Sequence, residues 1–234
     1  MLHRFHFPFP MLPGATARLA GEEFHPAARV RRLGEGEEIE LFDGSGTNAL
    51  AVVRRIGRDE LEAEILSTGL SDREPRIEVT LAIPLIQPDR FELVLQKATE
   101  LGISGFIPLL TDRTEVRPER MRGKKNRWER IILEAVKQSG RARVPRLEEE
   151  SSLDQILGRA GTHVLFDADA DPESAFRVEP QSTLLVGPEG GWSGRELDLA
   201  RETGCTFVRL GPRRLRAETA CIAAAVLASE IGNR

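Results

Sequence analysis

The feature that most constrains the fold is the alternation of strand-like and helix-like segments from residue 76 onward. Apolar strand-like segments occur at 77–86, 103–110, 163–166, 183–186 and 207–210. Helix-like segments lie between and after them, at 88–101, 124–138, 152–157, 193–201 and 218–231. Strands that alternate with helices form a parallel sheet whose two faces are covered by the helices. The sequence therefore predicts an α/β domain with a parallel sheet from this point on.

Short segments of strand-like alternation dominate the first 72 residues. They lie at 38–42, 49–53 and 61–66, and the turn sequence DGSG separates the first two. Two alternating segments joined by such a turn form a hairpin, and several short strands in so few residues indicate a small barrel or half-barrel. The polar stretch 71–75 ends in proline and marks a boundary. We expect a β domain at 1–72 and an α/β domain at 73–234.

The composition is that of an ordinary globular protein. Apolar residues make up 40% and charged residues 30% of the chain, which is typical of soluble domains. The N-terminal segment is interrupted by prolines, unlike a signal peptide, and no stretch approaches the roughly 18 apolar residues that cross a bilayer. Cys205 and Cys221 have neither metal-ligand nor disulfide spacing. We expect two buried thiols, no metal, no membrane partner and a cytoplasmic location.

Positive charge is concentrated in one segment of an acidic chain. The net charge is −4, but residues 113–146 contain twelve lysines and arginines and four acidic residues, a local excess of +8. A basic field of this kind attracts a polyanion such as RNA even when the total charge is negative. A solvated helix face with scattered arginines is the alternative.

A glycine-rich loop follows one of the predicted strands, in the stretch LLVGPEGGWSGRELDLA at 184–200. Gly187, Gly190 and Gly191 allow positive φ angles and a close approach of the backbone to a ligand. Ser193 can cap the helix that follows. The loop differs from the dinucleotide motif G-x-G-x-x-G and from a phosphate loop ending in G-K-[ST], so it does not require a phosphate. A tight strand-to-helix turn without a ligand is the alternative.

A second strand ends in a similar loop, in the stretch RLGPRRLRAETACIAAAVLASEI at 209–231. Two parallel strands that end in Gly-Pro loops bring their backbone groups together at one edge of the sheet, where ligands of open α/β sheets bind. The alanine-rich helix that follows permits close packing, either within the core or across a subunit interface. Bulky substitutions at Ala224 or Ala228 are expected to disturb that packing.

Several of these segments together resemble the ribosomal RNA small subunit methyltransferase E family, which belongs to the knotted SPOUT methyltransferases. The likeness is carried by the two glycine loops, LLVGPEGGWSGRELDLA and LGPRRLRAETA, and by LQKATELGI at 95–103 and EAVKQSGRARVP at 134–145. IELFDGSG at 39–46 resembles the N-terminal domain of the family. These blocks follow the family order over nearly the whole chain. One departure is Gln87-Pro88, where the family commonly has a lysine–glycine pair.

The resemblance implies a PUA-like β-barrel domain followed by an α/β domain with a trefoil knot, which the general rule against threaded chains would have excluded. It also implies S-adenosylmethionine as the cofactor and a homodimer as the active form. The implied reaction is methylation of N3 of a uridine in 16S rRNA of the small ribosomal subunit. N3 lies on the Watson–Crick edge, so the target uridine must be unpaired or flipped.

The residues expected to hold the cofactor belong to the two loops and to the strands that lead into them. They are Leu165, Leu185, Gly187, Glu189, Gly190, Gly191, Leu210, Gly211, Leu215, Thr219 and Ala220. Recognition of adenine requires apolar walls and backbone hydrogen bonds, which these positions can supply. An ordinary core role is the alternative for each leucine.

Methylation of N3 requires loss of the N3 proton and stabilisation of the negative charge that develops on the base. Arg216 is the expected cation, with Arg141 and Arg143 as further candidates, and a phosphate contact is an equal alternative for each. Glu218 or Glu189 is the expected general base. Glu218 also occupies the first turn of a helix, where an acid is favoured for structural reasons.

The arginines expected to contact the RNA backbone lie in the β domain and in the basic segment, and are Arg4, Arg18, Arg29, Arg32, Arg141 and Arg143. Two other functions stay open at this point. A knotted methyltransferase that acts on a different RNA would share the α/β motifs, and a non-catalytic RNA-binding or assembly protein would share the β domain. The intact glycine loops favour the enzyme, because a binding module has no need of a cofactor pocket.

Overall fold

The computed structural model describes residues 2–21, 23–24, 33–116, 119, 121 and 123–232. The chain divides into two compact units, the first formed by Met1–Glu74 with Val136–Val144 and the second by Pro75–Ala135 with Pro145–Arg234. The boundary between Ala135 and Val136 lies within one continuous helix, α3 (Lys125–Ser139). The sequence therefore has no turn or linker that would indicate that residues 136–144 belong to the first unit. Each unit therefore combines two separate stretches of the chain.

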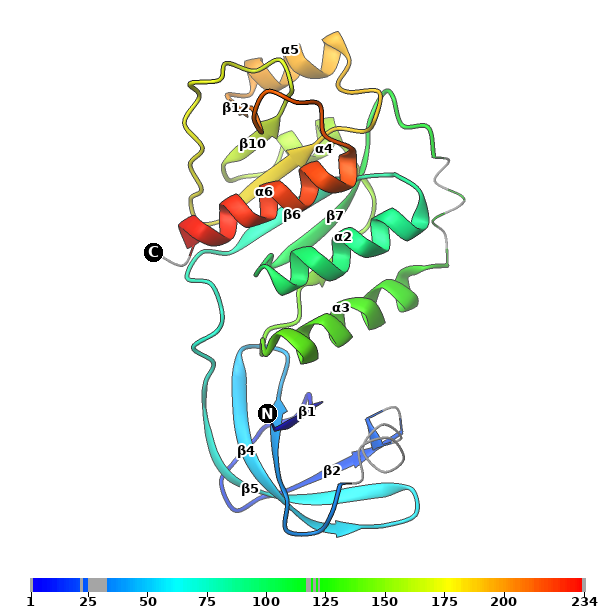
Figure 1. Ribbon diagram of the computed structural model, residues 1–234, viewed down its shortest axis with the longest axis vertical. Helices are drawn as coiled ribbons and strands as arrows, with labels where there is room; N and C mark the ends of the chain where they lie inside the picture. Colours follow the sequence, from blue (N-terminus) through cyan, green and yellow to red (C-terminus); the bar gives the residue numbers. More distant parts are fainter. Residues whose placement is uncertain are drawn as a thin grey trace. The chain divides into compact units, whose positions relative to one another are not determined.

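The first unit is a curled five-stranded sheet (Figure 1). Its strands are β1 (His3–His6), β2 (Thr16–Ala20), β3 (Glu38–Phe42), β4 (Thr47–Ile56) and β5 (Glu60–Leu70). Their order across the sheet is β1-β3-β4-β5-β2. β1 runs parallel to β3, and the other neighbouring strands are antiparallel. Irregular pairing between β4 and β5, near Leu50 and near Arg55, bends both strands.

The β3–β4 hairpin forms at the turn expected from the sequence DGSG. The Oδ1 atom of Asp43 accepts hydrogen bonds at 2.7, 3.1 and 3.0 Å from three backbone N–H groups, those of Ser45, Gly46 and Thr47. Gly44 has a φ angle of 84°, a conformation that strains any residue with a Cβ atom. The turn fixes the register of the two strands, so that alternate residues of β3 face the core.

The second unit is built on a parallel sheet, as the alternation of strands and helices predicts. Its strands are β6 (Val79–Pro84), β7 (Gly105–Leu110), β8 (Arg146–Leu147), β9 (Ser151–Ser152), β10 (His163–Phe166), β11 (Ser182–Val186) and β12 (Thr206–Val208). The order is β12-β10-β11-β6-β7-β8, β9 also pairs with β7, and each of these pairs is parallel. The loops that follow β12, β10, β11, β6 and β7 therefore meet along one edge of the sheet.

Helices cover both faces of this sheet. The helices of this unit are α2 (Pro88–Glu100), the first part of α3, α4 (Leu153–Leu157), α5 (Gly194–Glu202) and α6 (Ala217–Gly232). α2 and α6 lie side by side on one face (Figure 1). α4 and α5 pack against alternate strand residues such as Ala82, Leu165 and Leu185, which point to the other face.

Helix α6 follows β12 at the edge of the sheet but packs against α2, β6 and β11. The chain between β12 and α6 therefore passes beside the ends of β10 and β11. Cys221 is buried in α6, and burial raises the pKa of its thiol well above the ordinary value, whereas Cys205 is only partly buried. In the part of the chain that the structure describes, no helix is both long and apolar enough to cross a membrane.

Candidate functional site

A cavity of about 370 Å³ lies at the carboxyl ends of three neighbouring strands, β12, β10 and β11. Most of its lining comes from the residues that follow each strand, at 166–169, 186–192 and within 210–220. A cavity of this size is typical of a small-molecule site. Its position at the carboxyl ends of parallel strands is where α/β sheets bind ligands.

Trp192 holds the glycine loop after β11 against the neighbouring loop. Its Nε1 atom donates a hydrogen bond to the backbone carbonyl of Phe166 at 3.0 Å. A Cβ atom on Gly187 would lie only 3.0 Å from Cε2 and 3.1 Å from Nε1 of this indole ring. Gly191 has a φ angle of 69°, and its N–H donates to the carbonyl of Pro188 at 2.9 Å. The loop thus needs one glycine for a close approach and another for a left-handed turn.

The beginning of helix α5 anchors the same loop. Ser193 caps the helix as expected, in a capping box with Glu196. The carboxylate of Glu196 also accepts a hydrogen bond from the backbone N–H of Asp112 at 2.9 Å, which ties the loop after β7 to α5. Hydrogen bonds from Arg195 and Ser193 to the Asp112 carboxylate lower its pKa to about 2.

The loop after β12 forms another part of the cavity lining. Gly211 has a φ angle of 81°, and its carbonyl accepts a hydrogen bond from Nε of Arg209 at 3.0 Å. The N–H of Asp167 donates to the carbonyl of Val208 at 3.0 Å, which keeps the ends of β10 and β12 together. Leu215 adds apolar surface to this part of the lining.

The structure brings most of the residues predicted to bind a cofactor into the lining of this cavity. These are Gly187, Glu189, Gly190, Gly191, Leu210, Gly211, Leu215 and Ala220. Leu165 and Leu185 are fully buried core residues that pack with α4 and α5 instead, and Thr219 is exposed on α6 outside the lining. Both leucines lie within their strands, so their side chains point to a helix-covered face rather than beyond the strand ends.

Three charged side chains meet beside the glycine loop: Arg90 of α2, Glu189 of the loop and Glu218 of α6. The guanidinium of Arg90 forms an ion pair with Glu189, and its Nε atom lies 3.8 Å from Oε1 of Glu218. The Oε2 atom of Glu218 is buried and has no hydrogen-bond partner within the described part of the chain. Arg90 was not predicted, because its partner in the loop lies 99 residues away along the chain.

Of the two residues predicted to be catalytic, Glu218 belongs to this cluster and Arg216 does not. Arg216 is exposed in the segment before α6, and Glu218 has a side chain that is 12% exposed. Neither residue is part of the cavity lining. Glu189 is the acidic residue of this cluster that does line the cavity.

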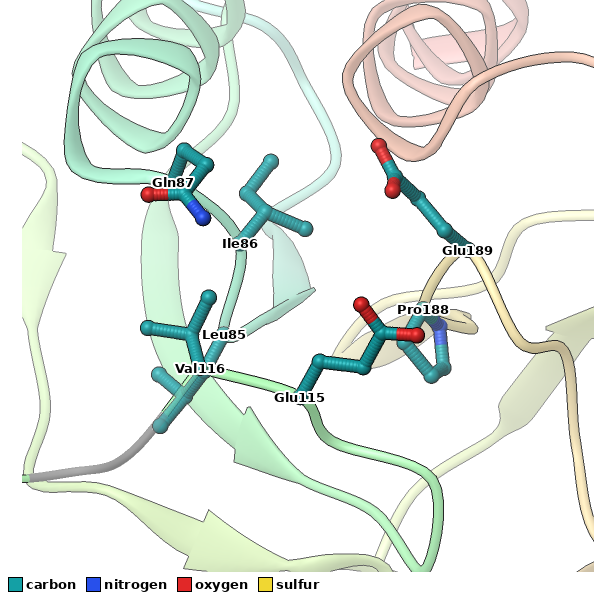
Figure 2. A pocket seen from close by; sticks show the side chains of 7 residues that line it. All are labelled: Leu85, Ile86, Gln87, Glu115, Val116, Pro188 and Glu189. Carbon is teal, nitrogen blue, oxygen red and sulfur yellow. The ribbon is translucent and has the colours of Figure 1, made fainter.

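A smaller pocket lies beside the cavity, where the residues after β6, β7 and β11 meet (Figure 2). Its volume is about 40 Å³, and its lining consists of Leu85, Ile86, Gln87, Glu115, Val116, Pro188 and Glu189. Pro188 and Glu189 also line the larger cavity, so the two spaces share one wall. Across the described ranges, no group of three or more histidine, cysteine, aspartate or glutamate side chains is arranged to hold a metal ion.

Two of the arginines predicted to contact RNA are buried in the first unit. Arg4 is 6% and Arg141 is 2% exposed. Arg141 forms an ion pair with Glu74 at 2.9 Å, and Arg4 pairs with Glu40 at 3.0 Å and donates to the carbonyl of Arg141 at 2.9 Å. A guanidinium that is enclosed in this way cannot reach a phosphate in solvent. The prediction for these two residues is therefore corrected: they stabilise the interior of the first unit.

The other predicted RNA contacts have different surroundings. The side chain of Arg18 is 69% exposed and pairs with Glu62 at 3.2 Å. Arg143 is partly exposed, and its Nε donates to the carbonyl of Ser45 at 3.4 Å. Arg29 and Arg32 lie outside the described residues. In the basic segment, acidic residues from elsewhere in the chain pair with several members, including Lys125, Arg127 and Lys137.

The fold and the cavity agree with a defined class of protein. Residues 73–229 match the model of the RNA methyltransferase domain, and residues 19–66 match the model of the RNA methyltransferase PUA domain. The protein is thus of the class of RNA methyltransferases that carry a PUA domain beside the α/β domain.

Similar proteins identify the particular family. The ribosomal RNA small subunit methyltransferase E of Bacillus subtilis is 33% identical over 220 residues, which cover 88% of this chain and 86% of that protein. The protein of the same name from Synechocystis is 34% identical over 216 residues, which cover 88% of this chain and 70% of that protein. The chain belongs to the ribosomal RNA small subunit methyltransferase E family.

Solved structures show the same fold. The ribosomal RNA small subunit methyltransferase E of Neisseria gonorrhoeae, bound to S-adenosylmethionine, is 31% identical and superposes with a TM-score of 0.90 over 99% of this chain and 98% of that one. A methyltransferase from Legionella pneumophila with the same cofactor bound is also 31% identical, with a TM-score of 0.87 over 97% of this chain and 96% of that one.

Proposed function

We propose that this protein transfers a methyl group from S-adenosylmethionine to N3 of a uridine in 16S rRNA of the small ribosomal subunit, in the cytoplasm. Membership of the ribosomal RNA small subunit methyltransferase E family supports the reaction and the substrate. The cofactor is supported by the two relatives that bind it. The observation that carries the proposal is the cavity between the two glycine loops, at the carboxyl ends of β12, β10 and β11.

The residues of this cavity fit S-adenosylmethionine. Leu210, Leu215 and Ala220 provide apolar surface for the adenine ring, and the loop 187–191 exposes backbone groups that can hydrogen-bond to its edge. Asp167 and Asp169 line the same space, and their carboxylates can accept hydrogen bonds from ribose hydroxyl and ammonium groups. A Cβ atom at Gly187 would press on the ring of Trp192 at about 3.0 Å, so glycine at this position keeps the backbone of the loop close to Trp192.

The cofactor supplies a methyl group that its positively charged sulfur has already activated. The protein must therefore place the uridine next to this methyl group, accept the N3 proton and balance the negative charge on the base. Arg216 is proposed to supply positive charge, either to the base or to a neighbouring phosphate. Glu218 does not line the cavity and is proposed to act through Arg90, which it approaches within 3.8 Å.

The β domain, predicted at 1–72, is proposed to bind the RNA around the target and to present it to the α/β domain, predicted at 73–234. The match of residues 19–66 to a PUA domain of RNA methyltransferases supports the proposed role of the β domain in RNA binding. Arg18 and Arg143 are proposed to contact phosphates, since their guanidinium groups are at least partly exposed. Contacts of this kind fix the position of the RNA but carry no sequence information.

The trefoil knot of the resembling family is part of the proposal. It is supported by the path of the chain, which runs from β12 at the sheet edge past the ends of β10 and β11 to α6, and α6 then packs on β11 and β6. A homodimer is also proposed. Val226 and Leu227 expose apolar surface on α6, at 42% and 37%, which a second copy would cover.

Calorimetric titration of the purified protein with S-adenosylmethionine tests the cofactor first. We expect binding with heat release and a rise in the melting temperature that grows with cofactor concentration. Absence of both signals in a folded protein would contradict the enzyme and favour a non-catalytic RNA-binding protein. Mass spectrometry of 16S rRNA from a strain that lacks the gene then identifies the nucleotide.

A further inference from the structure

The order of the strands places the smaller pocket next to the cofactor cavity. The cavity lies at the ends of β12, β10 and β11, and the pocket lies at the ends of β11, β6 and β7. The loop after β11 separates the two spaces, and its residues Pro188 and Glu189 line both. A group held in the pocket is therefore adjacent to a ligand in the cavity.

The pocket combines apolar walls with three polar side chains. The apolar surface comes from four buried residues, Leu85, Ile86, Val116 and Pro188. Figure 2 shows Gln87 on one side of the pocket and the carboxylates of Glu115 and Glu189 on the other. Gln87 precedes α2 but its side chain does not cap the helix, so its amide is available to a ligand.

These groups are complementary to the Watson–Crick edge of uracil. That edge presents one N–H donor, at N3, between two carbonyl acceptors. A carboxylate accepts a hydrogen bond from the N–H, and the amide of Gln87 donates one to a carbonyl oxygen. Cytosine has an unprotonated N3 at the same position, and its lone pair would face the carboxylate. The pocket therefore favours uracil over cytosine.

The size of the pocket indicates which part of the nucleotide it encloses. Its volume of about 40 Å³ holds on the order of three water molecules. The polar edge of a base can displace such waters, whereas the ribose and phosphate must stay outside. A base that has left its stack presents its edge in this way.

We propose that this pocket receives the Watson–Crick edge of the target uracil, with the Gln87 amide donating to a ring carbonyl and the Glu189 carboxylate accepting the N3 proton. The proposal rests on the methyltransferase function proposed above. It assigns to that function a base-recognition site and a general base.

The direction of the N3 lone pair selects Glu189 among the nearby acids. The lone pair lies in the ring plane along the line of the former N3–H bond, so the proton leaves toward the side of the cofactor cavity, and the methyl group approaches N3 along the same line after the proton has gone. Glu189 stands in the wall between the two spaces, whereas Glu115 lines only the pocket and Glu218 lines neither. The N3–H bond breaks, and its proton passes to Glu189. The electron pair left on N3 forms the bond to the methyl carbon, and the pair of the broken carbon–sulfur bond stays on sulfur.

Arg90 is the positioning residue for this carboxylate. Its ion pair holds Glu189, and its approach to Glu218 connects the glycine loop with the first turn of α6. Gln87 and Arg90 lie three residues apart at the start of α2. The start of α2 therefore positions both the Gln87 amide, which contacts the uracil ring, and the Arg90 guanidinium, which holds Glu189.

The test compares full-length variants on small ribosomal subunits that lack the modification. The variants are Glu189→Gln, Gln87→Ala and, as a matched control, Glu202→Gln, which makes the same change at an exposed residue of α5 outside both spaces. Two quantities are measured for each variant: the affinity for S-adenosylmethionine by calorimetry, and the single-turnover rate of methyl transfer from pH 6 to 10 at saturating concentrations. Methylation by the unmodified protein is measured first, so that a failure of the proposed function is recognised separately.

We expect Glu189→Gln to retain cofactor affinity and to lose about 100-fold or more in rate near neutral pH, with partial recovery as hydroxide replaces the missing base at high pH. Gln87→Ala is expected to lose about 10-fold in rate or apparent RNA affinity through one lost hydrogen bond, and Glu202→Gln is expected to behave as the unmodified protein. A Glu189→Gln rate near that of the unmodified protein, with the same pH profile, would overturn the proposal. A loss of cofactor affinity as large as the loss of rate would also overturn it, because Glu189 would then belong to the cofactor cavity alone.

Discussion

Gly187 lines the cofactor cavity and packs closely against the ring of Trp192. In Gly187→Val, the Cβ atom would lie about 3.0 Å from the ring of Trp192, and the two methyl groups would press further into it. Either Trp192 gives up its hydrogen bond to Phe166, or the loop moves. We expect the affinity for S-adenosylmethionine, measured by calorimetry, to fall at least about 10-fold, or 1.4 kcal/mol.

Gly194→Ala is the matched control for this substitution. A Cβ atom at Gly194 would meet no atom within 4 Å, and its φ angle is not positive. Both variants should keep the circular dichroism spectrum of the unmodified protein, and Gly194→Ala should also keep its affinity. An unchanged affinity in folded Gly187→Val would remove this loop from the cofactor site.

Asp112 links protonation to stability at the beginning of α5. Its pKa is lowered to about 2 in the folded state by Arg195 and Ser193, so the stabilisation is present above its ordinary pKa and is lost as the pH falls from about 4 to about 2. Because both partners are exposed to solvent, we expect Asp112→Asn to lower the free energy of unfolding by no more than about 1 kcal/mol at pH 7. Urea titrations at pH 7 and pH 2.5 should show this difference and then its decrease. An equal difference at both values would contradict the assignment.

Among the elements of the fold, the segment 136–144 is stabilised by one carboxylate, that of Glu74, whose side chain is 9% exposed. Glu74 pairs with Arg141 and accepts hydrogen bonds from the backbone N–H groups of Ala142 and Arg143 at 2.7 and 3.0 Å. Arg141→Ala would leave this carboxylate without its charged partner. We expect a loss of about 3–5 kcal/mol in the free energy of unfolding, measured by urea titration.

Arg143→Ala is the companion variant, because this side chain is partly exposed. It should cost less than about 1 kcal/mol in stability and should reduce RNA affinity, with a salt dependence that is flatter by about one unit in slope. If Arg141→Ala kept the free energy of unfolding of the unmodified protein and instead flattened the salt dependence of RNA affinity, Arg141 would contact RNA and would not stabilise the first unit.

The secondary structure of the α/β domain could be predicted from the sequence because it depends on local periodicity. The strand at 163–166 and the helix of 152–157, capped by Ser152, are found within a residue or so of the expected positions. The burial of Arg141 could not be predicted, because its partner Glu74 lies 67 residues away. The same holds for the ion pair of Arg90 with Glu189 and for the smaller pocket, which depend on which strands become neighbours.

At the scale of the whole molecule, α6 is the surface on which the proposed dimer depends. Ala224 and Ala228, the positions expected to contact another helix, are 0% and 3% exposed within the single chain. Bulky residues there would therefore disturb the core of the chain itself. The exposed apolar residues are Val226 and Leu227, and they provide a sharper test.

We expect the unmodified protein to be a dimer at micromolar concentration by light scattering, and Val226→Glu with Leu227→Glu to convert it to a monomer with little methyl transfer. Glu230→Gln, an exposed change on the same helix, is the control and should remain dimeric. A monomeric unmodified protein with full activity would contradict the dimer. It would also mean that a single chain binds the RNA and transfers the methyl group.

The two adjacent spaces at the edge of the sheet are proposed to bring a cofactor methyl group to N3 of one uridine. The most direct measurement is the incubation of the protein and labelled S-adenosylmethionine with small ribosomal subunits that lack the modification, followed by nucleoside mass spectrometry and mapping by primer extension. We expect one labelled methyl group per particle, on N3 of a single uridine of 16S rRNA, and a stop in primer extension at that position. Label on another atom or another nucleoside, or no label with a folded protein that binds the cofactor, would contradict it.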